Sequence, residues 1–301
     1  RRYDAFVAKF DAAGNRKWVR LVGTKGTDEA NGVTTTSTGA VVVVGDAAFS
    51  LAGRTHAGGS SDGFIAKFST NGARRWIRLV GSAGTDSMAS VDSDSSGNLY
   101  IAGLAGAKIG SRTYNGGQGD ALVTKYDKTG MQIWLELLGT SGLDGAYGVA
   151  AAQGGGLGVT GRAGGSMAGH AHNGGRFDGF VARFDSTGTR VWTRLVGSMG
   201  DDVTWRIAFG PKGHFQIVGA TPHRLPGNRY NGGPLDGFVA EYDGNGKRKG
   251  ITLIGTLGRD EATGVTVAPS GFTYISGSTS APLAGRAYNG GVSDAFFVRL
   301  R

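Results

Sequence analysis

The sequence contains no cysteine, only six prolines and few charged residues, and each shortage excludes a class of protein. Without cysteine the chain can form no disulfide, zinc–thiolate centre or thiol nucleophile. Charged residues make up 18% of the chain and hydrophobic residues 39%, which does not fit the highly charged, weakly hydrophobic composition of disordered chains. No apolar run approaches the roughly 20 residues that a membrane span needs. We therefore expect a soluble, globular chain with no membrane span, from which any export signal has been removed.

Glycine is the residue present in excess, with 57 of the 301 positions. Valine, threonine and aromatic residues accompany it, and this combination favours short strands joined by tight turns over helices. The net charge of +9 suits acidic partners, but it is also common in proteins that simply stay in solution. Composition alone thus predicts an all-β protein with almost no helix.

An internal repeat of 58 residues organises the chain. Segments of the type DGFVARF recur at this spacing, and they begin at Asp4, Asp62, Asp120, Asp178, Asp236 and Asp294. Within one period four strand signals alternate with glycine-containing turns such as SSGN and DKTG. A period of this length made of four up-and-down strands indicates a blade of a β-propeller, because one coil of a β-solenoid is much shorter.

Five periods predict a five-bladed β-propeller of four-stranded antiparallel blades, forming a single domain over residues 1–301. Four blades are expected to be continuous, at about 31–81, 89–139, 147–197 and 205–255. The fifth, 263–301, would be completed by residues 1–23, so that pairing of N- and C-terminal strands closes the ring. Asp4–Phe10 and Asp294–Leu300 compete for one strand position in that blade. We expect the N-terminal hairpin to supply both outer strands.

The repeat resembles the bacterial seven-bladed β-propeller (SBBP) repeat family. The resemblance rests on GTDSMASVDSDSSGNLYIAG at 84–103, on NGGQGDALVTKYDKTG at 115–130, and on their counterparts along the whole chain. It implies a propeller within an exported bacterial protein, of a kind that usually has no defined activity. The chain departs from the family name in having five periods, so the number of blades in that name is not carried over.

One aspartate column precedes the inner strand of every repeat, within G-[ST]-x-G-x-D loops: Asp28, Asp86, Asp144, Asp202 and Asp260. These carboxylates could bind calcium or sugar hydroxyls. We prefer a structural interpretation, in which each carboxylate caps backbone N–H groups of a glycine-rich loop, because a feature that every blade needs appears in every blade.

The loop before the third strand is a candidate ligand loop, because it combines a ring, an amide and often an arginine. A ring could stack on a sugar, and an amide could bind its hydroxyls. The alternative is that Asn-Gly-Gly is a turn and the ring a plug between blades. The candidate residues are Arg54, His56, Arg112, Tyr114, Asn115, His172, Asn173, Tyr230, Asn231, Arg286, Tyr288 and Asn289.

A second candidate site lies where the repeats disagree. Next to the invariant aspartate one column reads Asn31, Ala89, Tyr147, Trp205 and Thr263, and the following column includes Arg206. If these positions ring the central channel, Tyr147, Trp205 and Arg206 with Glu29 and Glu261 could form one axial pocket. Unconstrained drift at the surface would give the same pattern. Glu29 and Glu261 could also be a carboxylate pair for glycoside hydrolysis.

These patterns predict a non-enzymatic binding or scaffolding module that is exported, with multivalent lectin-like carbohydrate binding as one form of it and glycans or an anionic cell-surface polymer as partners. A carbohydrate-active enzyme with one axial site and a purely structural spacer remain alternatives. We expect no cofactor and no metal, since no metal-binding or phosphate-binding motif occurs. We also expect no nucleic-acid binding, because basic residues are spread over all repeats. The chain could belong to a longer protein or self-associate through a terminal strand.

Overall fold

The computed structural model describes residues 2–300, and nearly all their regular structure is β-strand. The one helical segment within this range is the 3₁₀ turn η1 (Pro211–Gly213). Two compact units make up the chain, an N-terminal unit that ends at Gly139 and includes Asp144–Ala146, and a C-terminal unit formed by Thr140–Leu143 and the chain from Tyr147 onward. No helix between residues 2 and 300 is long and apolar enough to cross a bilayer. The expectation of an all-β chain is confirmed.

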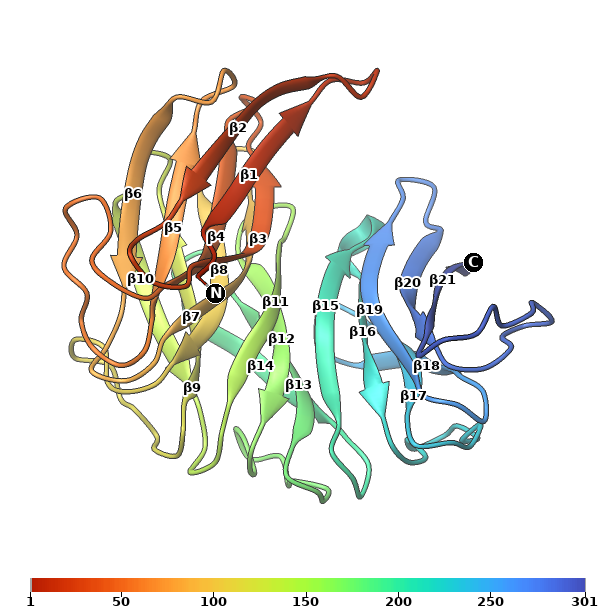
Figure 1. Cartoon of the computed structure of the whole chain (residues 1–301). Helices are drawn as coiled ribbons and strands as arrows, with labels where there is room; N and C mark the ends of the chain where they lie inside the picture. The colour runs from red at the N-terminus through yellow and green to blue at the C-terminus, as the bar shows by residue number, and fades with distance from the viewer. Residues whose placement is uncertain (1, 301) are drawn as a thin grey trace. The chain divides into compact units, whose positions relative to one another are not determined.

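The N-terminal unit contains a hairpin and two four-stranded antiparallel sheets (Figure 1). The hairpin consists of β1 (Ala5–Phe10) and β2 (Arg16–Val22). The first sheet is β3 (Glu29–Thr35), β4 (Val41–Ala47), β5 (Asp62–Phe68) and β6 (Arg74–Val80). The second sheet is β7 (Ser87–Ser93), β8 (Leu99–Ala105), β9 (Asp120–Tyr126) and β10 (Gln132–Leu138). Strands that follow one another in the sequence are neighbours in each sheet.

The C-terminal unit takes up β11 at Tyr147 and continues with the same up-and-down order. One sheet is β11 (Gly145–Ala151), β12 (Leu157–Ala163), β13 (Asp178–Phe184) and β14 (Arg190–Val196). The next is β15 (Val203–Phe209), β16 (Phe215–Thr221), β17 (Asp236–Tyr242) and β18 (Arg248–Ile254). The last has three strands, β19 (Asp260–Val267), β20 (Thr273–Thr279) and β21 (Asp294–Leu300). The four continuous blades expected from the sequence are therefore present as four-stranded sheets.

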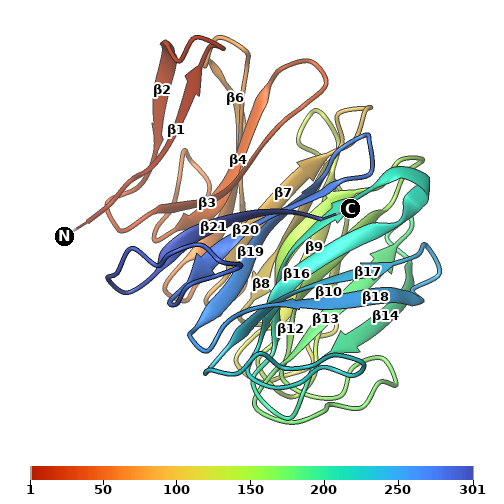
Figure 2. The same ribbon diagram turned by 90° about the vertical axis from the view of Figure 1, so that its right-hand side faces the viewer.

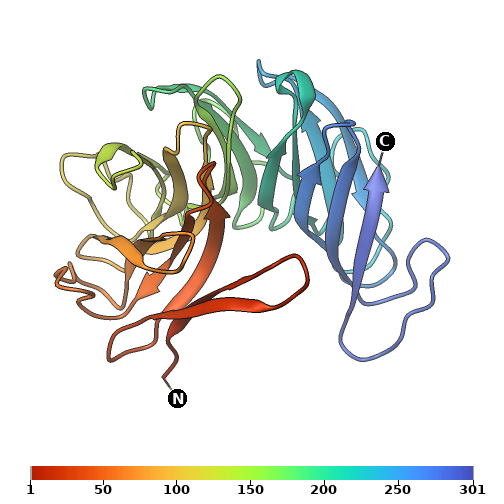
Figure 3. The ribbon, with the colours of Figure 1, turned by 90° about the horizontal axis from the view of Figure 1, so that it is seen from above.

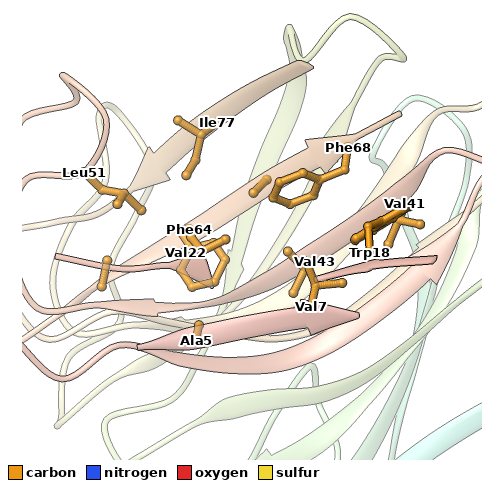
Figure 4. Close-up of a cluster of buried hydrophobic side chains, with 12 residues drawn as sticks. Ala5, Val7, Trp18, Val22, Val41, Val43, Leu51, Phe64, Phe68 and Ile77 are labelled. Atoms are coloured by element: carbon orange, nitrogen blue, oxygen red, sulfur yellow. The ribbon is translucent and has the colours of Figure 1, made fainter. Parts of the chain in front are cut away.

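The third strand of a blade is buried on both faces, which explains its unbroken apolar sequence. All seven residues of β5 are buried. Phe64 packs in a cluster with Val7 of the N-terminal hairpin, whereas its neighbour Ile65 packs with Met88 and Leu99 of the following sheet. Because successive side chains of a strand point to opposite faces, one strand contributes to two separate layers of core. Figure 4 shows the first of these clusters, between the hairpin and the sheet β3–β6.

The outer strands β2 and β14 are each fixed to the next blade by a tryptophan and an arginine. The Trp18 indole N–H donates to the Thr70 carbonyl at 3.0 Å, and Arg20 Nε donates to the Gly72 carbonyl at 2.7 Å. The guanidinium lies 5.9 Å from the centre of the Trp18 ring, within reach of a cation–π contact. Gly72 has a φ of +81°, and a Cβ added to it would lie 2.8 Å from the Trp18 ring. A turn glycine and a tryptophan therefore depend on each other across each such contact.

The prediction of which strands complete the last blade is wrong. We expected residues 263–301 to be completed by 1–23 through pairing of N- and C-terminal strands, with the N-terminal hairpin as its two outer strands. Instead β21 pairs with β20 over its full length, from Thr273 opposite Leu300 to Thr279 opposite Asp294, and β1 and β2 form a separate two-stranded sheet (Figures 2 and 3). The reason is that β21 already occupies the edge of β20 that β1 would need. The described residues thus form six sheets, not five.

Candidate functional site

The aspartates of the column before the inner strands accept hydrogen bonds from nearby backbone and hydroxyl groups, while Asp260 Oδ1 is buried without a partner in the described structure. Asp86 is buried, and its carboxylate accepts from the backbone N–H and hydroxyl of Ser82 and from the Gly106 N–H. Asp28, Asp202 and Asp260 accept equivalent bonds from a threonine or serine four residues earlier, and Asp144 is buried in the same way. Burial raises the pKa of Asp86 and Asp202 to about 6. These contacts are the ones expected if the aspartates cap backbone N–H groups and bind no ligand.

In three of the four candidate ligand loops that carry an asparagine, its side-chain amide bonds to the aspartate that opens the third strand, whereas the exposed Asn289 donates to Asp294 through its backbone N–H. The backbone N–H and the side-chain amide of Asn115 both donate to Asp120 Oδ2, at 2.7 and 2.9 Å. Asn173 and Asn231 make the same pair of bonds in their own blades. Since the amides of Asn115, Asn173 and Asn231 already donate to a buried carboxylate, they stabilise the loop and are not free to bind a sugar hydroxyl.

The rings of the same loops are half-buried, and their polar atoms also face the protein. The Tyr114 hydroxyl donates to the carbonyls of Gly106 and Gly117, and the hydroxyls of Tyr230 and Tyr288 donate to a glycine carbonyl three residues further on. His56 and His172 replace tyrosine in two blades, with Nε2 at 3.7 and 3.9 Å from the buried aspartate. Among the arginines, Arg112 pairs with Glu136 and Arg54 is exposed.

One candidate ligand loop borders a hollow. A pocket of about 410 Å³ lies beside β21, and its lining includes Arg286, Tyr288, Asn289 and Phe297. The pocket exists because β21 is an edge strand with no outer strand against it, and this leaves the Phe297 side chain 72% exposed. No cluster of three or more histidine or acidic side chains suited to a metal ion occurs in the described part of the chain.

The disagreeing column beside the invariant aspartate is the bulged residue of the inner strand. In β15 the pairing with β16 shifts between Thr204 and Arg206, so Trp205 is the extra residue, and the same shift occurs around Asn31, Ala89 and Thr263. A β-bulge leaves one residue outside the ladder and redirects its side chain. This explains why the frame of the blade tolerates any residue here, from alanine to tryptophan.

Tyr147 and Trp205, the bulge-column residues of β11 and β15, meet in the C-terminal unit. Their ring centres are 5.2 Å apart and the ring planes are tilted by 35°. Arg206 Nη1 donates to the backbone carbonyls of both residues, at 2.8 and 2.9 Å. Burial raises the pKa of Tyr147 and lowers that of Arg206. The structure therefore brings together the three expected members Tyr147, Trp205 and Arg206.

Two further residues, which sequence reasoning missed, extend this group. The Arg162 guanidinium of β12 lies 5.5 Å from the Tyr147 ring centre and 4.3 Å from that of Phe177. We call Tyr147, Arg162, Phe177, Trp205 and Arg206 the bulge platform. A signal for Arg162 was present, since its column also differs in every repeat: Asp46, Leu104, Arg162, Ala220 and Ser278.

The two glutamates proposed for the axial pocket do not belong to the bulge platform. Glu29 is exposed on β3 of the N-terminal unit, and Glu261 on β19 forms an ion pair with Arg259. Asp46, the counterpart of Arg162 in the N-terminal unit, accepts from the Asn31 amide at 3.1 Å and from the Met88 N–H. The same two columns thus form a satisfied polar contact in one unit and an aromatic, cationic group in the other.

Comparison with known proteins gives the fold but no family. No family model matches the chain. The regulatory protein FlaEY of Caulobacter vibrioides is 27% identical over 200 residues, which cover 60% of this chain and 21% of that protein, so the chain spans about a fifth of its relative. Among solved structures, hydrazine synthase of Kuenenia stuttgartiensis has 13% identity and a TM-score of 0.51, covering 91% of this chain and 69% of that one. A protein of unknown function from Bacteroides caccae has 9% identity and a TM-score of 0.49, covering 97% and 89%.

Proposed function

We propose that this chain is a non-enzymatic carbohydrate-binding module with one ligand site, the bulge platform, and that it is built from SBBP-type repeats of an exported bacterial protein. The observation that carries the proposal is the contact between Tyr147 and Trp205. Aromatic rings that line a shallow surface bind the apolar face of a sugar, and neighbouring polar groups fix its orientation. The other bulge residues, Asn31, Ala89 and Thr263, offer no ring.

Two further observations favour one site over five. The amides and hydroxyls of the candidate ligand loops are satisfied by their own loops, as described for Asn115 and Tyr114. The bulge platform holds two buried donors without a partner, Trp205 Nε1 and Arg162 Nε, whereas the unpartnered buried atoms of the candidate ligand loops are the Nε2 atoms of His56 and His172. Glu261 is engaged by Arg259, and this arrangement lends no support to a catalytic carboxylate pair.

Stoichiometry and one variant pair test the proposal. A glycan array identifies a binding saccharide, and calorimetric titration of that saccharide should give one site per chain. Trp205→Ala should abolish binding, because it removes half of the ring surface. Thr263→Ala is the matched control, since Thr263 is the exposed bulge residue of β19. Binding of several equivalents that survives Trp205→Ala would overturn the single site, and an array without any bound saccharide would overturn the function.

A second candidate is a loop-type glycan site at the pocket beside β21. It is favoured by one observation, that Arg286, Tyr288 and Asn289 line this pocket together. Replacement of Tyr288 by alanine would then reduce saccharide binding, whereas the same change at Tyr230, which does not line this pocket, would not. Retention of full affinity in Tyr288→Ala would remove this candidate.

A further inference from the structure

The two arginines of the bulge platform have no direct ion-pair partner among the described residues. Among residues 2–300, Arg162 and Arg206 form no ion pair, whereas Arg176 nearby pairs with Asp201 through its side chain and its backbone N–H. The pKa of Asp201 is lowered by its hydrogen bonds from Arg176 and, more weakly, by the charge of Arg162, so Arg162 acts on this carboxylate from a distance without bonding to it. Half-buried guanidinium groups without a counter-ion attract anions strongly, because the surroundings screen their charge less than water does.

The platform also holds hydrogen-bond donors without acceptors. Arg162 Nε and Trp205 Nε1 are buried, and neither has a partner in the described structure. A buried donor left unpaired costs about 1–3 kcal/mol, and for this reason most such groups in folded proteins are satisfied. Both side chains lie near the Tyr147 ring.

Arg162 is also held in place before any ligand arrives. Its guanidinium lies between the rings of Tyr147 and Phe177, and its terminal nitrogens donate no hydrogen bond to the residues that the structure describes. A guanidinium fixed in this way can bind a carboxylate with two parallel hydrogen bonds and loses little side-chain entropy on binding. The acceptor that fits best is therefore a carboxylate.

The ring geometry distinguishes a sugar from a flat aromatic acid. Tyr147 and Trp205 touch each other at a tilt of 35°, so no parallel slot separates them into which a planar ring could insert. Both rings are half-buried, and the C–H face of a pyranose suits the part of such a ring that solvent reaches. We propose that the bulge platform recognises an acidic saccharide of the uronic acid type, with its carboxylate on Arg162 and its ring on Trp205. This inference rests on the proposed function and specifies its ligand class.

A pair of ligands that differ only in charge tests the inference. Oligogalacturonate and its methyl-esterified form are titrated against the chain by calorimetry at low and high salt. We expect the ester to bind at least about tenfold more weakly than the acid, which is the effect of losing a charge-assisted contact, and added salt to weaken the acid only. Arg162→Gln should weaken binding of the acid by a similar factor and leave the ester unchanged. Arg190→Gln, an exposed charge on β14, is the matched control.

Each outcome decides between the two proposals. Equal binding of acid and ester, lost in Trp205→Ala, would overturn the acidic specificity and leave the carbohydrate site standing. Absence of binding by both ligands and by every saccharide on an array would overturn both. If Arg162→Gln unfolds the chain, Arg162→Lys keeps the charge but not the two-bonded geometry, and it should still bind the acid more weakly than the unchanged chain does. Unaltered affinity in this variant would contradict the role of Arg162.

Discussion

The glycine that follows each outer strand should be required for stability, because an aspartate oxygen lies where the Cβ of any other residue would be. In the N-terminal unit, a Cβ added to Gly139 would lie 2.1 Å from Asp120 Oδ1. Asp120 is fully buried, and its other oxygen accepts both bonds from Asn115. Gly139→Ala would force this carboxylate to move. Hydrogen bonds to a charged group contribute about 1.5–3 kcal/mol and overpacking costs about 1–3 kcal/mol, so we expect a loss of about 3–5 kcal/mol in unfolding free energy.

A double-mutant cycle measured by urea unfolding isolates this contact from the general cost of changing the loop. The fluorescence of the five tryptophans reports the transition, and the buried Trp134 lies on the neighbouring strand β10. In the Asp120→Ala background, Gly139→Ala should cost nothing, or should stabilise by up to about 1 kcal/mol through the lower entropy of the unfolded chain. Equal costs of Gly139→Ala in both backgrounds would refute the reasoning, because they would show that Gly139 is needed for some other contact.

Three further outcomes follow from burial. Burial raises the pKa of Asp86 from 3.8 to about 6, so the folded state binds this proton more tightly than the unfolded state does. The free energy of unfolding should therefore fall as the pH rises from about 4 to about 6, by roughly 2–3 kcal/mol from this group. Urea unfolding of Asp86→Asn should show a shallower fall, and an unchanged profile would contradict this cause. Phe64 and Phe6 share a repeat position but are 0% and 65% exposed, so Phe64→Ala should cost about 3–5 kcal/mol and Phe6→Ala about 0.5 or less, measured by denaturation. Deletion of residues 294–301 should lower the melting temperature, since it uncovers the buried face of β20; an unchanged melting curve would mean that another strand replaces β21.

Much of the fold was predictable because the repeats agree wherever a contact recurs. The spacing of the third-strand aspartates places one blade in each period, and the turn glycines mark the hairpins. The closing blade was not predictable in the same way. Residues 4–10 and 294–300 have nearly the same pattern, and each suits the edge of β20 equally well on sequence grounds. Adjacency decides between them, since β21 follows β20 directly along the chain and pairs with it in full register.

The candidate site was predictable only in part, for a related reason. Disagreement between repeats identified Tyr147 and Trp205, but the sequence did not reveal that their position is a bulge, because a bulge is defined by the partner strand. Arg162 was missed since it stands inside a strand among small residues. Conversely, Asn115 and its equivalents were overvalued as ligand groups. Their side-chain hydrogen bonds to the strand aspartate stabilise a turn, and from the sequence alone such a turn cannot be distinguished from a ligand-binding motif.

The contacts that recur in every blade have a consequence for exchanging repeats. Asp120 and Gly139, which depend on each other through side-chain space, belong to the same period, so a period transferred as a whole carries both. Across the boundary between blades, Trp18 and Arg20 bind main-chain carbonyls, and these are present whatever side chains the neighbouring period has. A period exchanged as a whole keeps these main-chain contacts, but its turn glycine must still face the tryptophan of the preceding period, as Gly72 faces Trp18. Two adjacent bulge residues then act as an interchangeable pair, and new binding specificities could be assembled by choosing which blades stand next to each other.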